Sequence, residues 1–259
     1  MLHKIVTLPG SHDRQNHMKA EMRKLNLTPC FHFGIQGNKL SKTELDNAVI
    51  EPNILRAGEI GCALSHLQLY RQMLKDDIPY MMILEDDIII ENSFPKVLPE
   101  ITRFVQSHLQ GTAAVLHLKK QYQYLSKVHA ITNEIGIYET QYAIGTPGYI
   151  ITKEAAANIL KIQTPLRWEI DIWKFYYYIG AVKIFAPNIS LIQTPEDFPS
   201  TINAMEKRVR NHRSTINRKL RFLSYLLSQA NGHQRLLFYL FCNLRKLYTR
   251  VNEKTICWY

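Results

Sequence analysis

Short apolar runs alternate with longer amphipathic segments along most of the chain. Apolar runs bounded by Gly, Pro or polar residues are typical of buried strands, and apolar residues three and four apart are typical of helices. The pattern predicts strands at residues 4–8, 31–35, 80–90, 113–118, 138–151 and 182–185. It predicts helices at residues 14–25, 59–74, 94–109, 153–162 and 171–179. Strands that alternate with helices indicate an α/β fold with a mostly parallel sheet flanked by helices.

The strand predicted at residues 80–90 carries three consecutive acids, Glu85, Asp86 and Asp87, between apolar residues. A buried carboxylate costs several kcal/mol unless a cation or hydrogen-bond donors compensate its charge. Because Ile88-Ile89-Ile90 continues the apolar run, we expect the acids to lie within the strand or at its edge. Ligands bind beyond the carboxyl ends of strands in such sheets. A hard divalent cation, Mn²⁺ or Mg²⁺, would compensate the acids there; a solvated acidic turn is the alternative.

The composition is that of a globular protein, with 46% hydrophobic and 21% charged residues in 259. The four cysteines are scattered without a CxxC pair, so we expect reduced cysteines rather than a disulfide framework or a zinc site. Neither a GxGxxG fingerprint nor a P-loop is present, which argues against a dinucleotide dehydrogenase or a Walker ATPase. The sequence also lacks a secretory h-region and an apolar run of the about 18 residues that a membrane-spanning helix needs. We therefore expect the protein to act in the cytoplasm.

Positive charge is concentrated at the end of the chain. Residues 207–259 contain twelve Lys or Arg and one acid, Glu253, whereas the whole chain has 32 basic and 22 acidic residues. We therefore divide the chain into a catalytic or binding domain at residues 1–206 and a basic, helical region at residues 207–259. Basic clusters alternate with apolar ones in that region, which favours binding to an anionic membrane surface. Packing against the main domain is the alternative, and nucleic-acid binding is the least favoured.

One motif pair identifies a family resemblance. The segment Gly58-Glu59-Ile60-Gly61-Cys62-Ala63-Leu64-Ser65-His66, followed by Leu84-Glu85-Asp86-Asp87, resembles the signature of glycosyltransferase family 25. This family includes bacterial lipooligosaccharide galactosyltransferases and has collagen galactosyltransferases as relatives. The resemblance extends over residues 1–200 and includes Gly148-Tyr149-Ile150-Ile151 before an Ala-rich helix, and an element that ends at Asp171. The opening differs, because only one of the family's two arginines, Arg14, is kept.

The resemblance implies a GT-A-like fold that binds a UDP-sugar, UDP-galactose, through Mn²⁺ or Mg²⁺. The acceptor would be a lipooligosaccharide or lipid-linked glycan at the cytoplasmic face of the inner membrane. Asp87 and Asp86 would hold the metal, and Glu85 and Asp86 would contact the ribose, the sugar hydroxyls or metal-bound water. The metal would stabilise the negative charge of the leaving diphosphate.

An inverting transfer also requires a general base for the acceptor hydroxyl. Asp171 is the predicted base and Glu169 the second choice, because the aromatic residue Trp168 beside them suits sugar binding. A helix N-cap is the alternative role for Asp171, a packed core residue for His66, and a surface helix residue for Arg14. The predicted substrate-binding residues are Leu8, Ser11, Arg14, Ser65, His66, Glu85, Asp86, Thr146, Gly148 and Gln193.

Other functions fit the same residues. The donor could be another UDP-hexose such as UDP-glucose. The acidic cluster could also serve a metal-dependent phosphoesterase. A sugar- or nucleic-acid-binding protein without catalytic activity is the third hypothesis.

Overall fold

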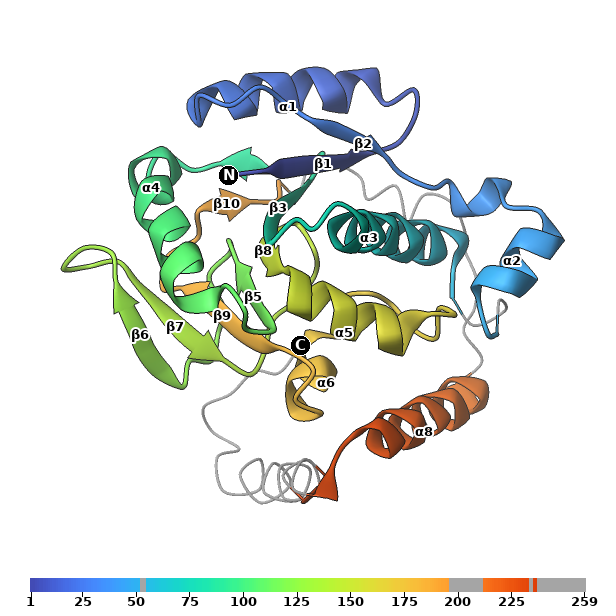
Figure 1. Ribbon diagram of the computed structural model, residues 1–259. Coiled ribbons are helices and arrows are strands. Elements are labelled where there is room, and N and C mark those ends of the chain that lie inside the picture. The colour runs from blue at the N-terminus through green and yellow to red at the C-terminus, as the bar shows by residue number, and fades with distance from the viewer. Residues whose placement is uncertain (52–54, 196–211, 233–234, 237–259) are drawn as a thin grey trace.

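An eight-stranded sheet forms the centre of the protein (Figure 1), as seen in a computed structural model that describes residues 1–51, 55–195, 212–232 and 235–236. Its strands are β1 His3–Thr7, β2 Phe31–Phe33, β3 Tyr80–Glu85, β5 Ala114–His117, β6 Ser126–Ala130, β7 Gly136–Thr140, β8 Gly148–Thr152 and β9 Lys183–Pro187, in the order β2-β1-β3-β8-β5-β9-β7-β6. The pairings leave β8 and β7 antiparallel to the other strands of this sheet. The predicted α/β fold with a mostly parallel sheet is therefore confirmed.

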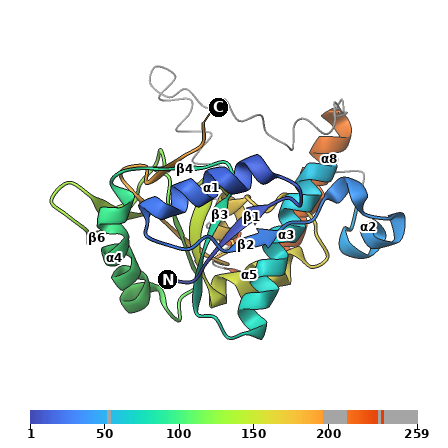
Figure 2. The same ribbon diagram turned by 90° about the horizontal axis from the view of Figure 1, so that it is seen from above.

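Helices cover both faces of the sheet (Figures 1 and 2). Buried residues of α1 and α4 belong to one apolar cluster, and those of α3, α5 and α6 belong to the other. The described helices are α1 His12–Lys24, η1 Gly37–Lys39, α2 Lys42–Ala48, α3 Ala57–Lys75, α4 Phe94–Phe104 with a π-helical extension η2 Val105–Leu109, α5 Lys153–Gln163, α6 Trp173–Tyr178 and α8 His212–Gln229. Among the described residues, no helix combines the length and the apolar character needed to cross a bilayer.

Strand β3 supplies both cores because its side chains alternate between the two faces. Met81 and Ile83 pack in the cluster of α3 and α5, whereas Met82 and Leu84 pack in the cluster of α1 and α4. All four side chains are fully buried. The apolar run before the acids is thus continuous because both faces of this central strand are covered.

The strand predicted at residues 80–90 is wrong in its extent. Strand β3 ends at Glu85, and Asp86 and Asp87 form a turn. The chain then enters β4, Ile89–Ile90, which pairs with β10, Ile192–Gln193, in a separate two-stranded sheet. The apolar residues after the acids therefore belong to a second strand, and the acids lie at a strand end, not inside a strand.

Other differences have equally local causes. The strand predicted at residues 138–151 is two strands, β7 and β8, separated by the loop that contains Gly145 and Pro147. Strand β6 was missed because its side chains are mostly exposed and carry no apolar alternation. Helix α2 was missed because a capping box between Ser41 and Glu44, not an apolar face, marks its start.

Helix α8 lies in the predicted basic region and packs on the rest of the protein. Its Phe222 and Leu226 are buried in the same cluster as residues of α3 and α5. Trp168 stacks on Phe222 with ring centroids 5.3 Å apart, and the Arg167 guanidinium lies 3.8 Å from the centroid of the Tyr225 ring. This part of the region therefore follows the packing alternative, while residues 207–211, 233–234 and 237–259 lie outside the described residues.

Candidate active site

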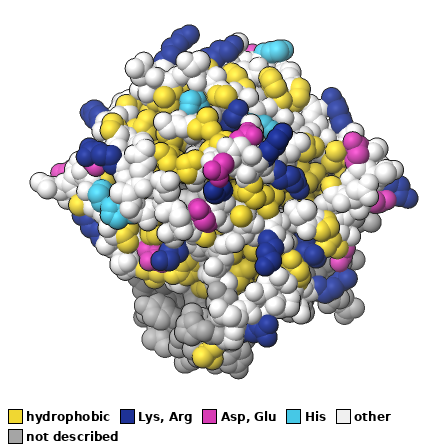
Figure 3. Space-filling model, in the orientation of Figure 1, with side chains coloured by type: hydrophobic (Ala, Val, Ile, Leu, Met, Phe, Trp, Pro, Cys, Tyr) yellow, Lys and Arg dark blue, Asp and Glu magenta, His cyan; other side chains and the backbone are white. Residues whose placement is uncertain are grey.

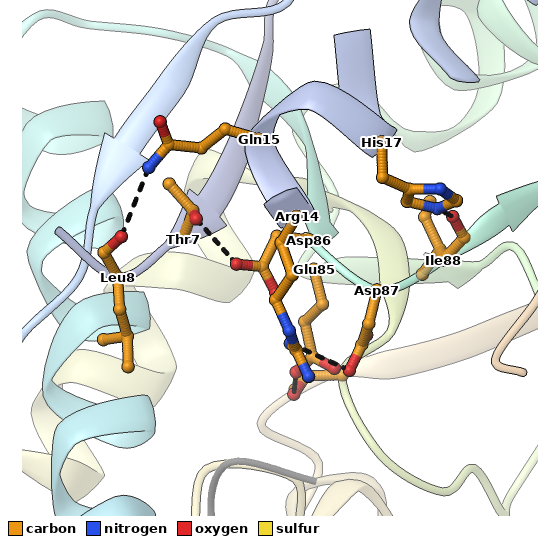
Figure 4. A network of polar contacts seen from close by, with 10 residues as sticks. Thr7, Leu8, Arg14, Gln15, His17, Glu85, Asp86, Asp87 and Ile88 are labelled. Carbon is orange, nitrogen blue, oxygen red and sulfur yellow. Dashed lines mark hydrogen bonds and ion pairs between the residues drawn. The ribbon is translucent and has the colours of Figure 1, made fainter. Parts of the chain in front are cut away.

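The turn of Asp86 and Asp87, called the acidic turn below, lies beside the end of β1, the parallel neighbour of β3. Thr7 Oγ1 donates a hydrogen bond of 2.6 Å to Asp86 Oδ2, and Arg14 Nη1 donates one of 2.6 Å to Asp86 Oδ1 (Figure 4). The same Arg14 nitrogen lies 3.2 Å from Asp87 Oδ2. Arg14 thus joins both aspartates from the start of α1, so a purely surface role for this arginine is wrong.

The two aspartates differ in what remains available for a ligand. Both oxygens of Asp86 accept hydrogen bonds within the protein. Asp87 Oδ1 is buried and has no hydrogen-bond partner among the described residues. Burial, together with the charge of Asp86, raises the pKa of Asp87, against the opposing effect of Arg14. A buried carboxylate oxygen without a donor is a site that a hard cation would satisfy, so the residues present fit Mn²⁺ or Mg²⁺.

Glu85 is the third acid and is held from the opposite side. Thr146 Oγ1, in the loop before β8, donates a hydrogen bond of 2.5 Å to Glu85 Oε1. Burial raises the pKa of Glu85 to about 7, with further contributions from the charges of Asp87, Asp86 and Asp171 and an opposing one from the Thr146 hydrogen bond. Near neutral pH this carboxyl can therefore exist in either protonation state.

Two adjoining cavities bring most of the predicted site residues together. The smaller cavity, of about 140 Å³, is lined by the predicted residues Leu8, Ser11, Arg14, Ser65, His66, Glu85, Asp86 and Asp87. The larger cavity, of about 660 Å³, is lined by Glu85, Thr146, Glu169 and Asp171, with Lys119 and Thr194. Cys62 and Glu85 line both. Cys62 and Glu85 thus lie between a compartment on the Arg14 side and one on the Asp171 side.

The family motif at residues 58–66 of α3, called the α3 motif below, contributes to the lining of both cavities. Ser65 Oγ donates to the Gly61 carbonyl at 2.6 Å and accepts from the Ile35 amide at 2.8 Å, so it joins α3 to the loop after β2. His66 is fully buried, and its Nδ1 lies 2.6 Å from the Tyr149 hydroxyl. Burial lowers the pKa of His66 to about 3, so this histidine is neutral at physiological pH.

Asp171 lies in a turn two residues before α6. The N-cap of that helix is Ile172, without a side-chain cap, so the N-cap alternative for Asp171 is wrong. Burial raises the pKa of Asp171, and backbone hydrogen bonds within this turn and from Gly145 oppose the shift. The Trp173 indole donates a hydrogen bond of 2.7 Å to the Gly145 carbonyl. These contacts fix the loop of Thr146 against the turn that carries Asp171.

Two predicted substrate-binding residues lie outside both cavities. Gly148 is the first residue of β8, where an added Cβ would lie 2.5 Å from Ile192 Cδ1. Its small size is therefore explained by packing. The Gln193 side chain in β10 donates a hydrogen bond to Glu91. The polar residues Glu196 and Asp197, which follow Gln193 in the sequence, lie outside the described residues.

Sequence reasoning missed several residues that line the site, among them Thr7 and Cys62. Thr7 lies inside the first predicted strand and is the last residue of β1, beside the strand that carries the acids. That neighbourhood is a result of the fold, which the sequence pattern did not report. Cys62 stands inside the α3 motif, one helical turn before His66, and lines both cavities. The cysteine spacing alone gave no reason to place it there.

The sequence model of Glycosyltransferase family 25 (LPS biosynthesis protein) matches residues 3–173, about two thirds of the chain. The chain belongs to glycosyltransferase family 25. The match includes the α3 motif, the acidic turn and the turn of Asp171, so every residue that lines the two cavities, except Thr194, lies in the matched segment. The protein is therefore a glycosyltransferase, and the resemblance seen in the sequence is confirmed.

Curated relatives agree with this assignment. The lipooligosaccharide biosynthesis protein lic2B of Haemophilus influenzae is 21% identical over 95% of this chain and 94% of its own length. The lacto-N-neotetraose biosynthesis glycosyltransferase LgtE of Neisseria meningitidis serogroup B is 24% identical over 69% of this chain and 68% of its own length. Human procollagen galactosyltransferase 2 is 22% identical over 60% of this chain, which spans 26% of that relative.

Proposed function

We propose that this glycosyltransferase transfers galactose from UDP-galactose to a sugar of a lipooligosaccharide acceptor, with inversion and in a metal-dependent reaction. The observation that carries the proposal is the acidic turn, where Asp87 Oδ1 is buried beside a cavity with no hydrogen-bond partner among the described residues. The relatives named for lipooligosaccharide biosynthesis and for procollagen galactosylation support the choice of acceptor and of donor sugar.

Asp87 would hold a bound Mn²⁺ or Mg²⁺, with Asp86 as a second carboxylate that Thr7 and Arg14 orient. When bound, the ion supplies positive charge that stabilises the diphosphate as it leaves. Arg14 adds a fixed positive charge on the same side, where a nucleotide diphosphate would meet Leu8 and Ser11 at the end of β1.

Asp171 would act on the acceptor side. An acceptor in the larger cavity lies between Asp171 and Glu85, which both line that cavity. Asp171 would take the proton of the attacking hydroxyl, and its raised pKa makes it a better proton acceptor than an ordinary aspartate. Glu169 lines the same cavity and is the second candidate for this role.

A transfer assay tests the proposal. The protein is incubated with labelled UDP-galactose, Mn²⁺ and an acceptor that ends in glucose or lactose, in parallel with UDP-glucose and with a chelator. We expect galactosylated product that is lost with the chelator and an inverted anomeric configuration by NMR. Equal product with the chelator contradicts the metal. Product that forms with UDP-glucose but not with UDP-galactose would show that glucose is the sugar transferred. Release of phosphate from simple esters, without sugar transfer, would favour the phosphoesterase.

We also propose that the enzyme works in the cytoplasm, at the inner face of the inner membrane, and that the end of the basic region binds anionic lipid. Residues 237–259 contain four Lys or Arg and one acid. Because α8 is packed on the domain, a chain that lacks only residues 237–259 separates anchoring from folding. We expect the full chain, but not this truncated one, to sediment with phosphatidylglycerol vesicles at low salt. Equal sedimentation of the two chains contradicts this role.

A further inference from the structure

Three side chains with different metal-binding chemistry meet where the two cavities join. The Cys62 thiol, the His66 imidazole and the Glu85 carboxylate each offer one ligand atom, and these atoms all lie within 4.8 Å of one another. Cys62 and Glu85 line both cavities and His66 lines the smaller one, so an ion can reach the group through either. Sulfur, nitrogen and carboxylate oxygen suit Zn²⁺, whereas Mg²⁺ and Mn²⁺ prefer oxygen ligands.

Helix and strand geometry fix the three ligands. Cys62 and His66 are four residues apart in α3, so their side chains lie on the same face of the helix, one turn apart. Glu85 is the last residue of β3, and its carboxylate is oriented by the hydrogen bond from Thr146. The ligands therefore come from two rigid elements, which is the condition for a preorganised site.

His66 provides independent evidence for a ligand. Its Nε2 is buried and has no hydrogen-bond partner among the described residues. Its Nδ1 lies 2.6 Å from the Tyr149 hydroxyl, which lies 2.6 Å from the Tyr70 hydroxyl. The tautomer with the proton on Nδ1 donates to Tyr149 and leaves the lone pair of Nε2 for a metal. Metal-ligating histidines are usually held in this way by a second hydrogen bond.

We propose that Cys62, His66 and Glu85 bind one thiophilic divalent ion of the Zn²⁺ class, at a position separate from the oxygen ligands of Asp87. The thiol releases its proton to solvent when the ion binds, and the thiolate and carboxylate then balance the charge of the ion. The spacing of the cysteines predicts no zinc site, because no CxxC pair is present. The site proposed here needs no such pair, since its ligands are one cysteine, one histidine and one glutamate. It does not depend on which sugar the enzyme transfers.

Co²⁺ is the probe, because a cobalt–thiolate bond gives an absorption band that oxygen and nitrogen ligands do not. The reduced, metal-free full chain is titrated with Co²⁺, and one equivalent of Zn²⁺ is then added. We expect the thiolate band to saturate at one equivalent and to disappear with Zn²⁺. Cys62→Ser should remove the band. Cys30→Ser should keep it, because Cys30 lies elsewhere, in contact with Lys4 Nζ at 3.2 Å.

Tyr149→Phe is the second test and leaves all three ligands in place. It removes the hydroxyl that orients His66, which is also the hydrogen-bond partner of the Tyr70 hydroxyl. We therefore expect Zn²⁺ affinity to fall by about 10- to 100-fold. The proposal is overturned by Co²⁺ binding without a thiolate band, by a band that survives Cys62→Ser, or by unchanged Zn²⁺ affinity in Tyr149→Phe. Circular dichroism of each variant shows that the fold is kept. Transfer with Mn²⁺ is measured separately, so failure of this site leaves the galactosyltransferase proposal standing.

Discussion

At the scale of single residues, the neighbouring acids of the turn have different surroundings. Both carboxylate oxygens of Asp86 accept hydrogen bonds, from Thr7 and Arg14. Asp87 has one buried oxygen without a hydrogen-bond partner among the described residues. Sequence reasoning found the acids, because three carboxylates in an apolar run are costly without a counter-ion. The sequence could not assign a separate role to each acid, because each role depends on partners about 70 to 80 residues away in the chain.

The role of Asp171 can be tested by removing its charge and keeping its shape. Asp171→Asn should lower turnover by about 10²- to 10⁴-fold, the usual contribution of a general base, with little change in UDP affinity. Initial rates and UDP titrations measure the two effects separately. Glu169→Gln is the matched variant, and a larger loss of turnover there would move the base to Glu169.

A buried histidine should make stability depend on pH. His117 in β5 is fully buried, neither ring nitrogen has a hydrogen-bond partner among the described residues, and burial lowers its pKa to about 3. Below about pH 6.5 this histidine binds a proton in the unfolded chain, whereas in the folded chain it stays neutral down to about pH 3. The free energy of unfolding therefore falls as the pH falls from about 6.5 towards 3. The slope from this residue approaches 1.4 kcal/mol per pH unit.

His117→Phe should therefore flatten the dependence of the free energy of unfolding on pH between 6.5 and 4. Urea unfolding at several pH values measures the slope. Exposed His12→Asn is the control and should leave the slope as it is in the natural chain. An unchanged slope in His117→Phe would show that the folded protein accepts this proton.

At the scale of elements, the α3 motif is as much a packing motif as a site motif. An added Cβ on Gly61 would lie 2.4 Å from the Ile35 carbonyl oxygen and 2.8 Å from the Gly37 amide nitrogen. Helix α3 therefore approaches the backbone before and within η1 so closely that only glycine fits. This close approach brings Cys62, Ser65 and His66 to the cavity beside the ends of β1 and β3.

Gly61→Ala separates helix propensity from packing. Alanine would favour the helix by about 1 kcal/mol, but its neighbours are backbone atoms that cannot move alone. We expect the clash to exceed the gain and to lower the free energy of unfolding by about 1–3 kcal/mol. Gly232→Ala, where nothing lies within 4 Å of the added Cβ, should change stability by less than about 0.5 kcal/mol. Equal stability of the two variants would contradict the close approach.

The elements that sequence patterns predicted are those with continuous apolar faces. Helix α3 is buried over most of its length, and strand β3 is buried on both faces and therefore has a continuous apolar run. Strand β6 pairs with β7, and β4 pairs with β10, and sequence patterns do not report such pairings. The end of β3 at Glu85 is likewise set by the turn and not by a change in hydropathy.

At the scale of the whole molecule, helix α8 of the basic region packs beside the segment that leads to Asp171. Phe222 stacks on Trp168 and Tyr225 contacts Arg167, two residues that directly precede Glu169 and the turn of Asp171. Arg221 also pairs with Glu51 at 3.2 Å. Figure 3 shows Lys and Arg side chains spread over one face rather than gathered in one patch. The boundary at residue 206 thus separates a basic stretch of sequence from the rest of the chain. It does not separate two cores, because Phe222 and Leu226 of the described part of the basic region are buried with residues of α3 and α5.

Phe222→Ala tests this connection. The loss of a buried aromatic side chain should lower the free energy of unfolding by about 3 kcal/mol. We also expect a higher KM for the acceptor, with UDP affinity kept, because the stack with Trp168 is lost. Leu236→Ala, at a side chain that is 53% exposed, is the control and should alter neither quantity. Unchanged stability in Phe222→Ala would show that α8 does not contribute to the core.

If Asp87 holds the ion against which the donor diphosphate binds, the affinity for UDP depends on that ion. Isothermal titration of chelator-treated protein with UDP, before and after addition of Mn²⁺, measures this most directly. We predict that Mn²⁺ tightens UDP binding by at least about tenfold, or 1.4 kcal/mol, in the natural chain and has no such effect in Asp87→Asn. UDP affinity that is the same with and without Mn²⁺ in the natural chain would contradict the claim.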